Sequence, residues 1–200
     1  MQKSFEKITR GYKKFRDKYS EKETSLMQDL AEVGQHPEIM FVACCDSRVD
    51  PALLLQCHPG DLFIVRNIAN IIPPYECDES HHGTSAALEF GICYLKVKHL
   101  IIMGHSQCGG ISAFLNQDEL HQDDFISRWT DLIHVKNHEN LSVDACAKSA
   151  LQSSYKNCLT FPWIKQRIEN QQLQIHLWFF DISMAQIQTY DFSEQSFKEL

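Results

Sequence analysis

The sequence predicts an α/β fold: a mostly parallel central β-sheet flanked by helices, with an N-terminal helical arm over residues 1–33. Short apolar runs rich in strand-forming residues alternate with segments of helical periodicity, which is typical of βαβ units. The chain has 200 residues, of which 44% are hydrophobic. That length and composition suffice for a core of ordinary size, so we expect residues 1–200 to form a single domain.

The elements follow from the apolar spacing and the turn residues, taken in order. Two helices open the chain at about residues 4–18 and 22–33; the hydroxyl and acidic residues near 20–25 cap the second, and Gly34 ends it. The remaining elements are expected as strands at 38–45, 59–67, 98–106 and 172–183, with 185–192 pairing beside the last, and as helices at 51–57, 83–95, 108–115 and through much of 120–170. The helix at 83–95 is expected to be buried.

Charge is unevenly distributed along the chain. The formal net charge is −7, yet residues 1–18 carry seven basic and two acidic side chains. Such a start could contact a membrane, a nucleic acid or an acidic partner. The apolar side chains of this segment recur at helical spacing, however, which favours an ordinary amphipathic helix with solvated lysines. The remainder of the chain would repel phosphate, so we expect no nucleic-acid partner.

Membrane insertion and disulfides are not expected either. No apolar run approaches the roughly 18–20 residues that a membrane span needs. The eight cysteines are even in number, which raises the possibility of a disulfide framework. A chain of this length does not require one, and its start lacks the apolar centre of an export signal. We therefore expect reduced thiols and a cytoplasmic protein.

Metal-binding residue types follow two of the predicted strands. Cys44, Asp46 and Arg48 end the first strand, and His105 and Cys108 end the third. Sites in parallel sheets form beyond the carboxyl ends of the strands, and thiolate with imidazole suits zinc. Cysteines that merely pack in the core, or a nucleophilic Cys–His pair, remain alternatives at this point.

Alternation along an extended strand distinguishes the two adjacent cysteines. It places Cys44, Asp46 and Arg48 on one side and turns Cys45 to the other, toward core packing. A carboxylate so close to a metal ligand either binds the metal or accepts a hydrogen bond from metal-bound water, and a guanidinium can hold it. An ordinary surface ion pair is the alternative for Asp46 and Arg48.

Several motifs together resemble the β-class carbonic anhydrases. The segments concerned are CCDSRVDP, PGDLFIVRNIAN, GTSAALEFGICYLKVKHLIIMGHSQCGG and IHLWFFDIS. The likeness extends over about residues 5–190, and C-x-D-x-R with H-x-x-C-G-G are its specific core motifs. The PPY loop and the run GQHPEIMFVAC are similar to the plant-type branch.

This resemblance implies an enzyme that reversibly hydrates carbon dioxide to bicarbonate and a proton, by attack of zinc-bound hydroxide. One Zn²⁺ per subunit would be held by Cys44, His105 and Cys108. Asp46 and Arg48 match the catalytic pair. Ten histidines are present, and none is favoured as the group that carries the proton away.

The resemblance also implies roles near the substrate. Gln35 matches a glutamine that hydrogen-bonds substrate, and Phe63 matches an aromatic residue of the apolar CO₂ pocket. Phe90 stands where the family often has tyrosine. Phe41 stands where an allosteric branch tends to have tryptophan, so we expect the open form, with Asp46 paired to Arg48 rather than bound to zinc.

Family members are homodimers or multiples of dimers, such as homotetramers, with the active cleft at the dimer interface. The apolar stripe of Phe5, Ile8, Tyr12 and Phe15 is then expected to wrap a neighbouring subunit; packing within its own subunit is the alternative. Two other functions are considered: a relative that hydrates CS₂ or COS, and a zinc-stabilised sensor without activity. A zinc-stabilised sensor would not need Asp46, Arg48 or Gln35.

Overall fold

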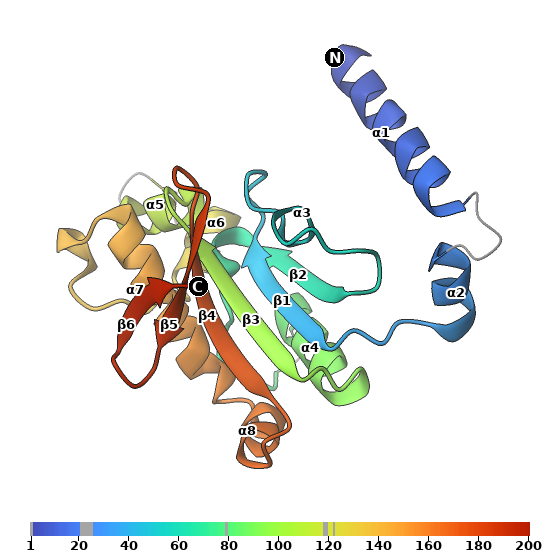
Figure 1. Ribbon diagram of the computed structural model, residues 1–200. Helices are drawn as coiled ribbons and strands as arrows, with labels where there is room; N and C mark the ends of the chain where they lie inside the picture. The colour runs from blue at the N-terminus through green and yellow to red at the C-terminus, as the bar shows by residue number, and fades with distance from the viewer. Residues whose placement is uncertain (1, 21–25, 79, 118–119, 122) are drawn as a thin grey trace.

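A six-stranded sheet forms the centre of the computed structural model, which describes residues 2–20, 26–78, 80–117, 120–121 and 123–200 (Figure 1). The strand order is β2-β1-β3-β4-β5-β6. The four strands β1 to β4 run parallel, and the last two pair antiparallel. The strands are β1 (Ile39–Cys44), β2 (Leu62–Asn67), β3 (His99–His105), β4 (Gln174–Asp181), β5 (Gln186–Asp191) and β6 (Ser196–Glu199). The predicted α/β fold with a mostly parallel sheet is confirmed.

Burial explains why the central strands read as continuous apolar runs. In β1 and β3 every residue after the first is buried, as is expected where a parallel sheet is covered on both faces. The register pairs Cys44 with Asn67 of β2 and Ala43 with Met103 of β3. The carboxyl ends of β1, β2 and β3 therefore lie together at one edge of the sheet, as in Figure 1.

The helices of the described residues connect these strands. They are α1 (Gln2–Ser20), α2 (Leu26–Val33), α3 (Pro51–Leu54), α4 (Gly83–Glu89), α5 (Gly109–Leu115), α6 (Phe125–Thr130), α7 (Val143–Cys158) and α8 (Pro162–Glu169), with the short turns η1 (Ile68–Asn70), η2 (Phe90–Tyr94) and η4 (His138–Asn140). Helix α7 packs against β3 and β4, where Leu151 lies over Gly104. No helix within the described ranges is long and apolar enough to cross a membrane.

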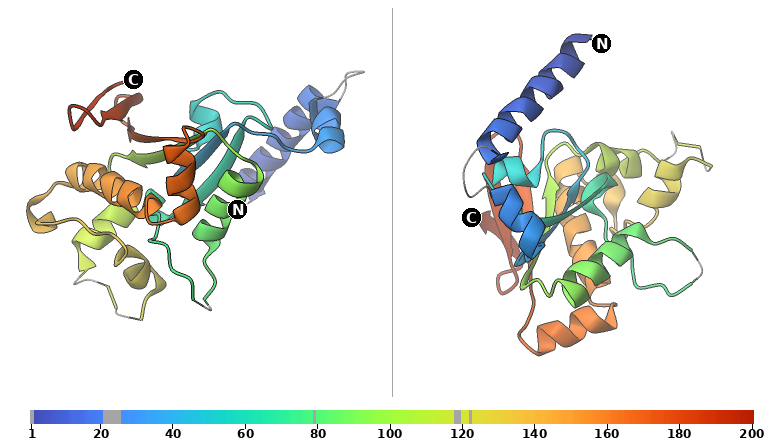
Figure 2. Two further views of the ribbon diagram at one scale, coloured as in Figure 1. Left: turned by 90° about the horizontal axis from the view of Figure 1, so that it is seen from below. Right: turned by 90° about the vertical axis from the view of Figure 1, so that its right-hand side faces the viewer.

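Helix α1 extends away from the central sheet in Figure 1 and in the right view of Figure 2. Its last turn contacts the body through Tyr19, whose hydroxyl lies 3.2 Å from His58 Nδ1. The apolar side chains of its outer turns stay exposed, with Phe5 at 75% and Ile8 at 70%. The expected N-terminal helix is thus present, and the described part of the chain leaves the apolar side chains of its outer turns exposed.

Most predicted elements lie where expected, and the differences have local causes. Gly34 ends α2 with a φ of 85° and donates its N–H to Leu30 O. The predicted cap of that helix lies outside the described residues, except for Ser20 at the end of α1. The helix predicted over 83–95 divides into α4 and the π-helical turn η2, and it is not wholly buried, because Phe90 is 43% exposed. Strand β6 was not predicted.

Candidate metal centre

Three predicted ligands meet at the carboxyl edge of the sheet. Cys44 ends β1, His105 ends β3, and Cys108 immediately precedes α5; all three are buried. Their ligand atoms lie within 4.8 Å of one another. The two sulfurs are 3.9 Å apart, and all eight cysteines are free, as expected.

The imidazole of His105 is oriented by the backbone that follows it. Nδ1 lies 2.9 Å from the carbonyl oxygen of Ser106, so Nδ1 carries the proton and donates it there. Nε2 then presents its lone pair toward the sulfurs. It is buried without a hydrogen-bond partner in the part of the chain that the structure describes. A buried, unpartnered lone pair is costly unless a cation occupies the space in front of it.

The two thiols share one proton. The hydrogen bond with Cys108 lowers the pKa of Cys44, and the backbone N–H groups of Asp46 and Ala69 lower it further. The same bond, together with burial, raises the pKa of Cys108. Cys44 is therefore the first to ionise, and a cation that binds both sulfurs displaces the shared proton.

The donor set fits zinc. Two thiolates and one imidazole are ligands that Zn²⁺ prefers, and Zn–S bonds of about 2.3 Å in a tetrahedron put two sulfurs roughly 3.8 Å apart. The observed 3.9 Å agrees with that separation. Three protein ligands with a free fourth position are typical of catalytic zinc, whereas structural sites are closed by four. The close grouping of these three ligand atoms favours a metal centre over cysteines that merely pack in the core and over a nucleophilic Cys–His pair.

Asp46 lies beside this centre and is held by Arg48. Arg48 Nε donates to Asp46 Oδ1 at 2.9 Å and Nη2 donates to Oδ2 at 2.7 Å, which makes a two-pronged pair. Asp46 Oδ2 is 3.9 Å from His105 Nε2. The guanidinium holds the pKa of Asp46 well below its usual range, so the carboxylate stays ionised. Arg48 also donates to the carbonyl oxygen of Gln107, which ties the two strand ends together.

Arg66 is a residue of this centre that the sequence reasoning missed. From β2 it donates to the carbonyl oxygens of Cys44 and Asp46, at 2.9 and 2.7 Å, and pairs with Asp50 at 2.8 Å. It thereby fixes the backbone that carries the ligand and the carboxylate. The signal was available: an arginine that continues the alternation of Leu62 and Ile64 in an apolar strand requires acceptors at the strand end.

A close backbone contact fixes Cys108. A Cβ on Gly110 would lie 2.5 Å from Ile68 Cγ2 and 3.0 Å from the Cβ of Ala69. Ala69 has a φ of 59°, and its backbone N–H is among the groups that lower the pKa of Cys44. Only glycine at position 110 lets α5 approach this turn, which brings the two ligands into one group.

The prediction that Cys45 packs in the core is wrong. Cys45 is exposed, although it does follow Cys44 directly on the opposite side. The ladder ends at Cys44, and the N–H of Cys45 makes one further bond to Asn67 O at 2.9 Å. Alternation determines the direction of a side chain, but burial also requires a covering element, and no described residue covers Cys45 enough to bury it.

Three predicted substrate residues lie elsewhere in this subunit. Gln35 is exposed before β1 begins, and Phe63 pairs in register with Met40, four residues before Cys44. Four residues of strand correspond to about 13 Å. Phe63 and Phe90 contact each other, with ring centroids 5.8 Å apart. The structure thus brings together the ligands, Asp46 and Arg48, but not these three side chains.

Comparisons with known proteins agree with this geometry. The family model described as carbonic anhydrase matches residues 39–187. A carbonic anhydrase of Synechocystis is 32% identical over 197 residues, covering 93% of this chain and 71% of that protein. The chloroplastic beta carbonic anhydrase 5 of Arabidopsis thaliana is 36% identical over 160 residues, covering 74% of this chain. This chain spans about half, 52%, of that second relative.

Solved structures give the same result. The beta-carbonic anhydrase CcaA superposes with a TM-score of 0.88 at 31% identity, covering 98% of this chain and 100% of that one. A tetrameric beta-carbonic anhydrase of Sordaria macrospora gives a TM-score of 0.74 at 29% identity, covering 93% of each chain. With its motifs, its fold and its buried Cys–His–Cys group, the chain belongs to the β-class carbonic anhydrases.

Proposed function

We propose that this chain hydrates carbon dioxide reversibly to bicarbonate and a proton at the group formed by Cys44, His105 and Cys108, with one zinc ion per subunit. The observation that carries the proposal is the buried His105 Nε2, which has no partner among the described residues and faces two thiols. A zinc ion bound there would lower the pKa of a water molecule enough to supply hydroxide near neutral pH.

The residues around the centre orient the reaction. Asp46 is ionised and acceptor-only, so its carboxylate is suited to accept a hydrogen bond from the attacking nucleophile and direct its lone pair at the substrate. Arg48 holds that carboxylate in a two-pronged pair and thereby keeps it from acting as a fourth ligand. Arg66 keeps Cys44 and Asp46 in register through their carbonyl oxygens.

The complete site is proposed to need a second copy of the chain. Gln35, Phe63 and Phe90 lie too far from the metal centre of their own subunit, so we assign them to the substrate pocket of a neighbouring one. The exposed apolar face of α1 and the exposed Phe90 ring support self-association as a dimer or a multiple of dimers. The relative from Sordaria macrospora is described as tetrameric.

We extend the proposal to organisation and location. Residues 1–200 act as one domain with the arm at 1–33, in the cytoplasm, without a nucleic-acid or membrane partner. The free state of all eight cysteines and the net charge of −7 support this assignment.

Hydration kinetics test the reaction and the role of Asp46 together. Wild type and Asp46→Asn are compared by stopped-flow CO₂ hydration across pH, with zinc per chain measured on the same samples. We expect both to hold one zinc and the variant to be slower by about 10- to 100-fold, because it loses the charged acceptor beside the ligands. If the zinc-loaded wild type has no activity, the result would instead support a zinc-stabilised sensor. If it turns over COS or CS₂ in preference to CO₂, the result would support the relative that acts on those substrates.

A further inference from the structure

A second cavity lies at the opposite end of the sheet from the metal centre. It has a volume of about 630 Å³ and opens between η2, α8 and the first residues of β3 and β4. His99 begins β3 and His105 ends it, so roughly 20 Å of strand separates this cavity from the metal ligands. The volume lies within the range of small-molecule sites.

The lining of this cavity is basic in an acidic protein. Ten residues line it: Ile92, Cys93, Lys96, Lys98, His99, Arg167, Gln171, Gln172, Leu173 and Gln174. None of the ten is acidic, whereas the whole chain has 26 acidic and 19 basic residues. Burial raises the pKa of the Cys93 thiol, so that thiol adds no negative charge.

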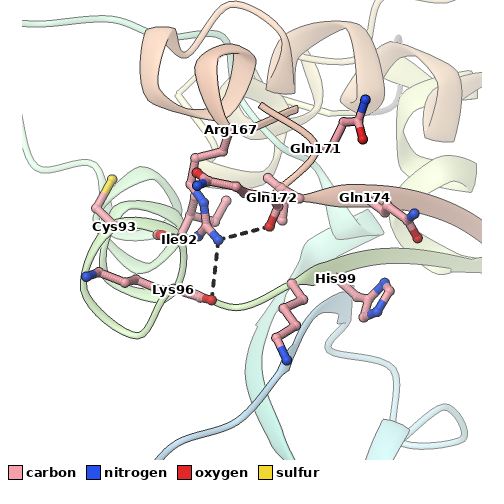
Figure 3. A pocket seen from close by; sticks show the side chains of 10 residues that line it. Ile92, Cys93, Lys96, His99, Arg167, Gln171, Gln172 and Gln174 are labelled. Atoms are coloured by element: carbon pink, nitrogen blue, oxygen red, sulfur yellow. Dashed lines mark hydrogen bonds between the residues drawn. The ribbon is translucent and has the colours of Figure 1, made fainter. Parts of the chain in front are cut away.

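Arg167 is the central cation of the lining. Figure 3 shows its guanidinium between Lys96 and Gln172. It donates to the carbonyl oxygens of Ile92, Lys96 and Gln172, and no carboxylate among the described residues pairs with it. Three of its five N–H donors are used in this way, which fixes the plane of the guanidinium but leaves its charge uncompensated.

Two lysines lie at the cavity, and they differ in their partners. Lys98 donates to Glu38, so its charge is largely balanced. The ammonium of Lys96 has no hydrogen bond or ion pair with the described residues, and the side chain is exposed. The lining therefore has two uncompensated cations, Arg167 and Lys96, together with three glutamines.

We propose that this cavity binds a small organic anion that carries two phosphate or two carboxylate groups. Arg167 offers a rigid, desolvated cation, Lys96 offers a mobile one, and the glutamine amides hydrogen-bond the polar carbon skeleton between the charged groups. No carboxylate belongs to the lining itself, and the nearby carboxylate of Glu38 is paired with Lys98. This site is separate from the carbon dioxide site, and the proposal does not depend on the reaction proposed above.

Titration calorimetry of the whole protein with two probes tests the proposal. Fructose 1,6-bisphosphate supplies the phosphate chemistry and succinate the carboxylate chemistry, each at constant ionic strength set with chloride. We expect one saturable site per chain for at least one probe, and the tighter probe identifies the source of the charge. Absence of saturable binding for both probes overturns the proposal.

Matched variants locate the binding. Lys96→Gln removes an unpaired cation and is expected to weaken binding at least 5-fold. Gln174→Glu adds a carboxylate to the lining and is expected to weaken it at least 10-fold; both positions are exposed, so folding is preserved. Lys165→Gln, also exposed on α8 but outside the lining, is the control and should change affinity less than 2-fold. An equal loss in Lys165→Gln and Lys96→Gln would show that only overall charge matters, and the site assignment would then be wrong.

Discussion

Two adjacent cysteines differ completely in their surroundings. Cys44 is buried at 4% exposure with its sulfur 3.9 Å from that of Cys108, whereas Cys45 is exposed. We therefore expect Cys44→Ser to reduce zinc per chain at least 10-fold, because a hydroxyl is a poor replacement for a thiolate ligand. Cys45→Ser should keep one zinc per chain and most of the activity. Metal analysis of both purified variants measures this, and zinc loss in Cys45→Ser would contradict the assignment of ligands.

The direction and burial of single side chains could be predicted from the sequence where the residue belongs to a β-strand, and less well beyond the end of the strand. Alternation placed Cys44 on the side where His105 and Cys108 lie, because β1 continues to that residue. It predicted the wrong burial for Cys45, which follows the last strand residue. Arg66 was missed because an arginine in an apolar strand shows that acceptors are needed, but not that they are the carbonyl oxygens of Cys44 and Asp46.

At the scale of elements, Arg66 ties β2 to the end of β1. Arg66→Met removes three hydrogen bonds, of which two go to carbonyl oxygens and one to Asp50, and its side chain is 26% exposed. We expect a loss of about 2 kcal/mol in the free energy of unfolding, as is typical of charge-assisted bonds near the interior. Urea denaturation measures it. Arg128→Met is the control, since that side chain is 68% exposed and, among the described residues, forms an ion pair only with Asp123, at 3.3 Å; it should cost less than about 0.5 kcal/mol.

Helix α5 offers a matched pair of glycines. Gly110→Ala would place a methyl group 2.5 Å from Ile68 Cγ2, so α5 and η1 must separate. We expect a loss of about 1–3 kcal/mol and weaker zinc binding, because Cys108 moves with the helix. Gly109→Ala meets nothing within 4 Å and should be neutral or stabilising by up to about 1 kcal/mol. Denaturation and competition with a zinc chelator measure both effects; equal behaviour of the two variants would contradict the close approach.

Elements were predictable where their apolar pattern was long. The strands β1, β3 and β4 are six to eight residues long and mostly apolar, so they were found. Strand β6 is only Ser196–Glu199 and contains a single aromatic residue, and it exists because β5 provides an edge to pair with. The turn η2 was read as buried helix because apolar residues on both of its faces conceal which face is covered. Phe90 and Tyr94 lie on the exposed one and stack, with ring centroids 5.7 Å apart.

For the whole molecule, the separation of the predicted site residues is the informative feature. The metal ligands lie at the carboxyl ends of the strands, while Phe63 lies about 13 Å away along β2 and contacts Phe90. A sequence pattern cannot distinguish a residue that completes its own site from one that completes a neighbour's. Both the position of these aromatic rings and the uncovered α1 are explained if two copies share their sites.

Helix α1 provides the test of that arrangement. Phe5, Ile8 and Tyr12 are 75%, 70% and 63% exposed along one stripe of a helix that extends from the body (Figure 1). If a second copy covers them, each large apolar side chain contributes up to about 1.5–3 kcal/mol to association. The triple change of these residues to serine should therefore raise the dimer dissociation constant by more than about 100-fold. Deletion of residues 1–18 should have at least as large an effect.

Sedimentation velocity over a range of protein concentrations measures both changes, with zinc content as the check that the metal centre is intact. The matched control replaces Lys3, Lys7 and Lys14 by glutamine, which changes the charge of the same helix and keeps its apolar stripe. That variant should associate like wild type. An unchanged dimer in the serine variant and in the deletion would show that the apolar stripe of α1 takes no part in the association of the subunits.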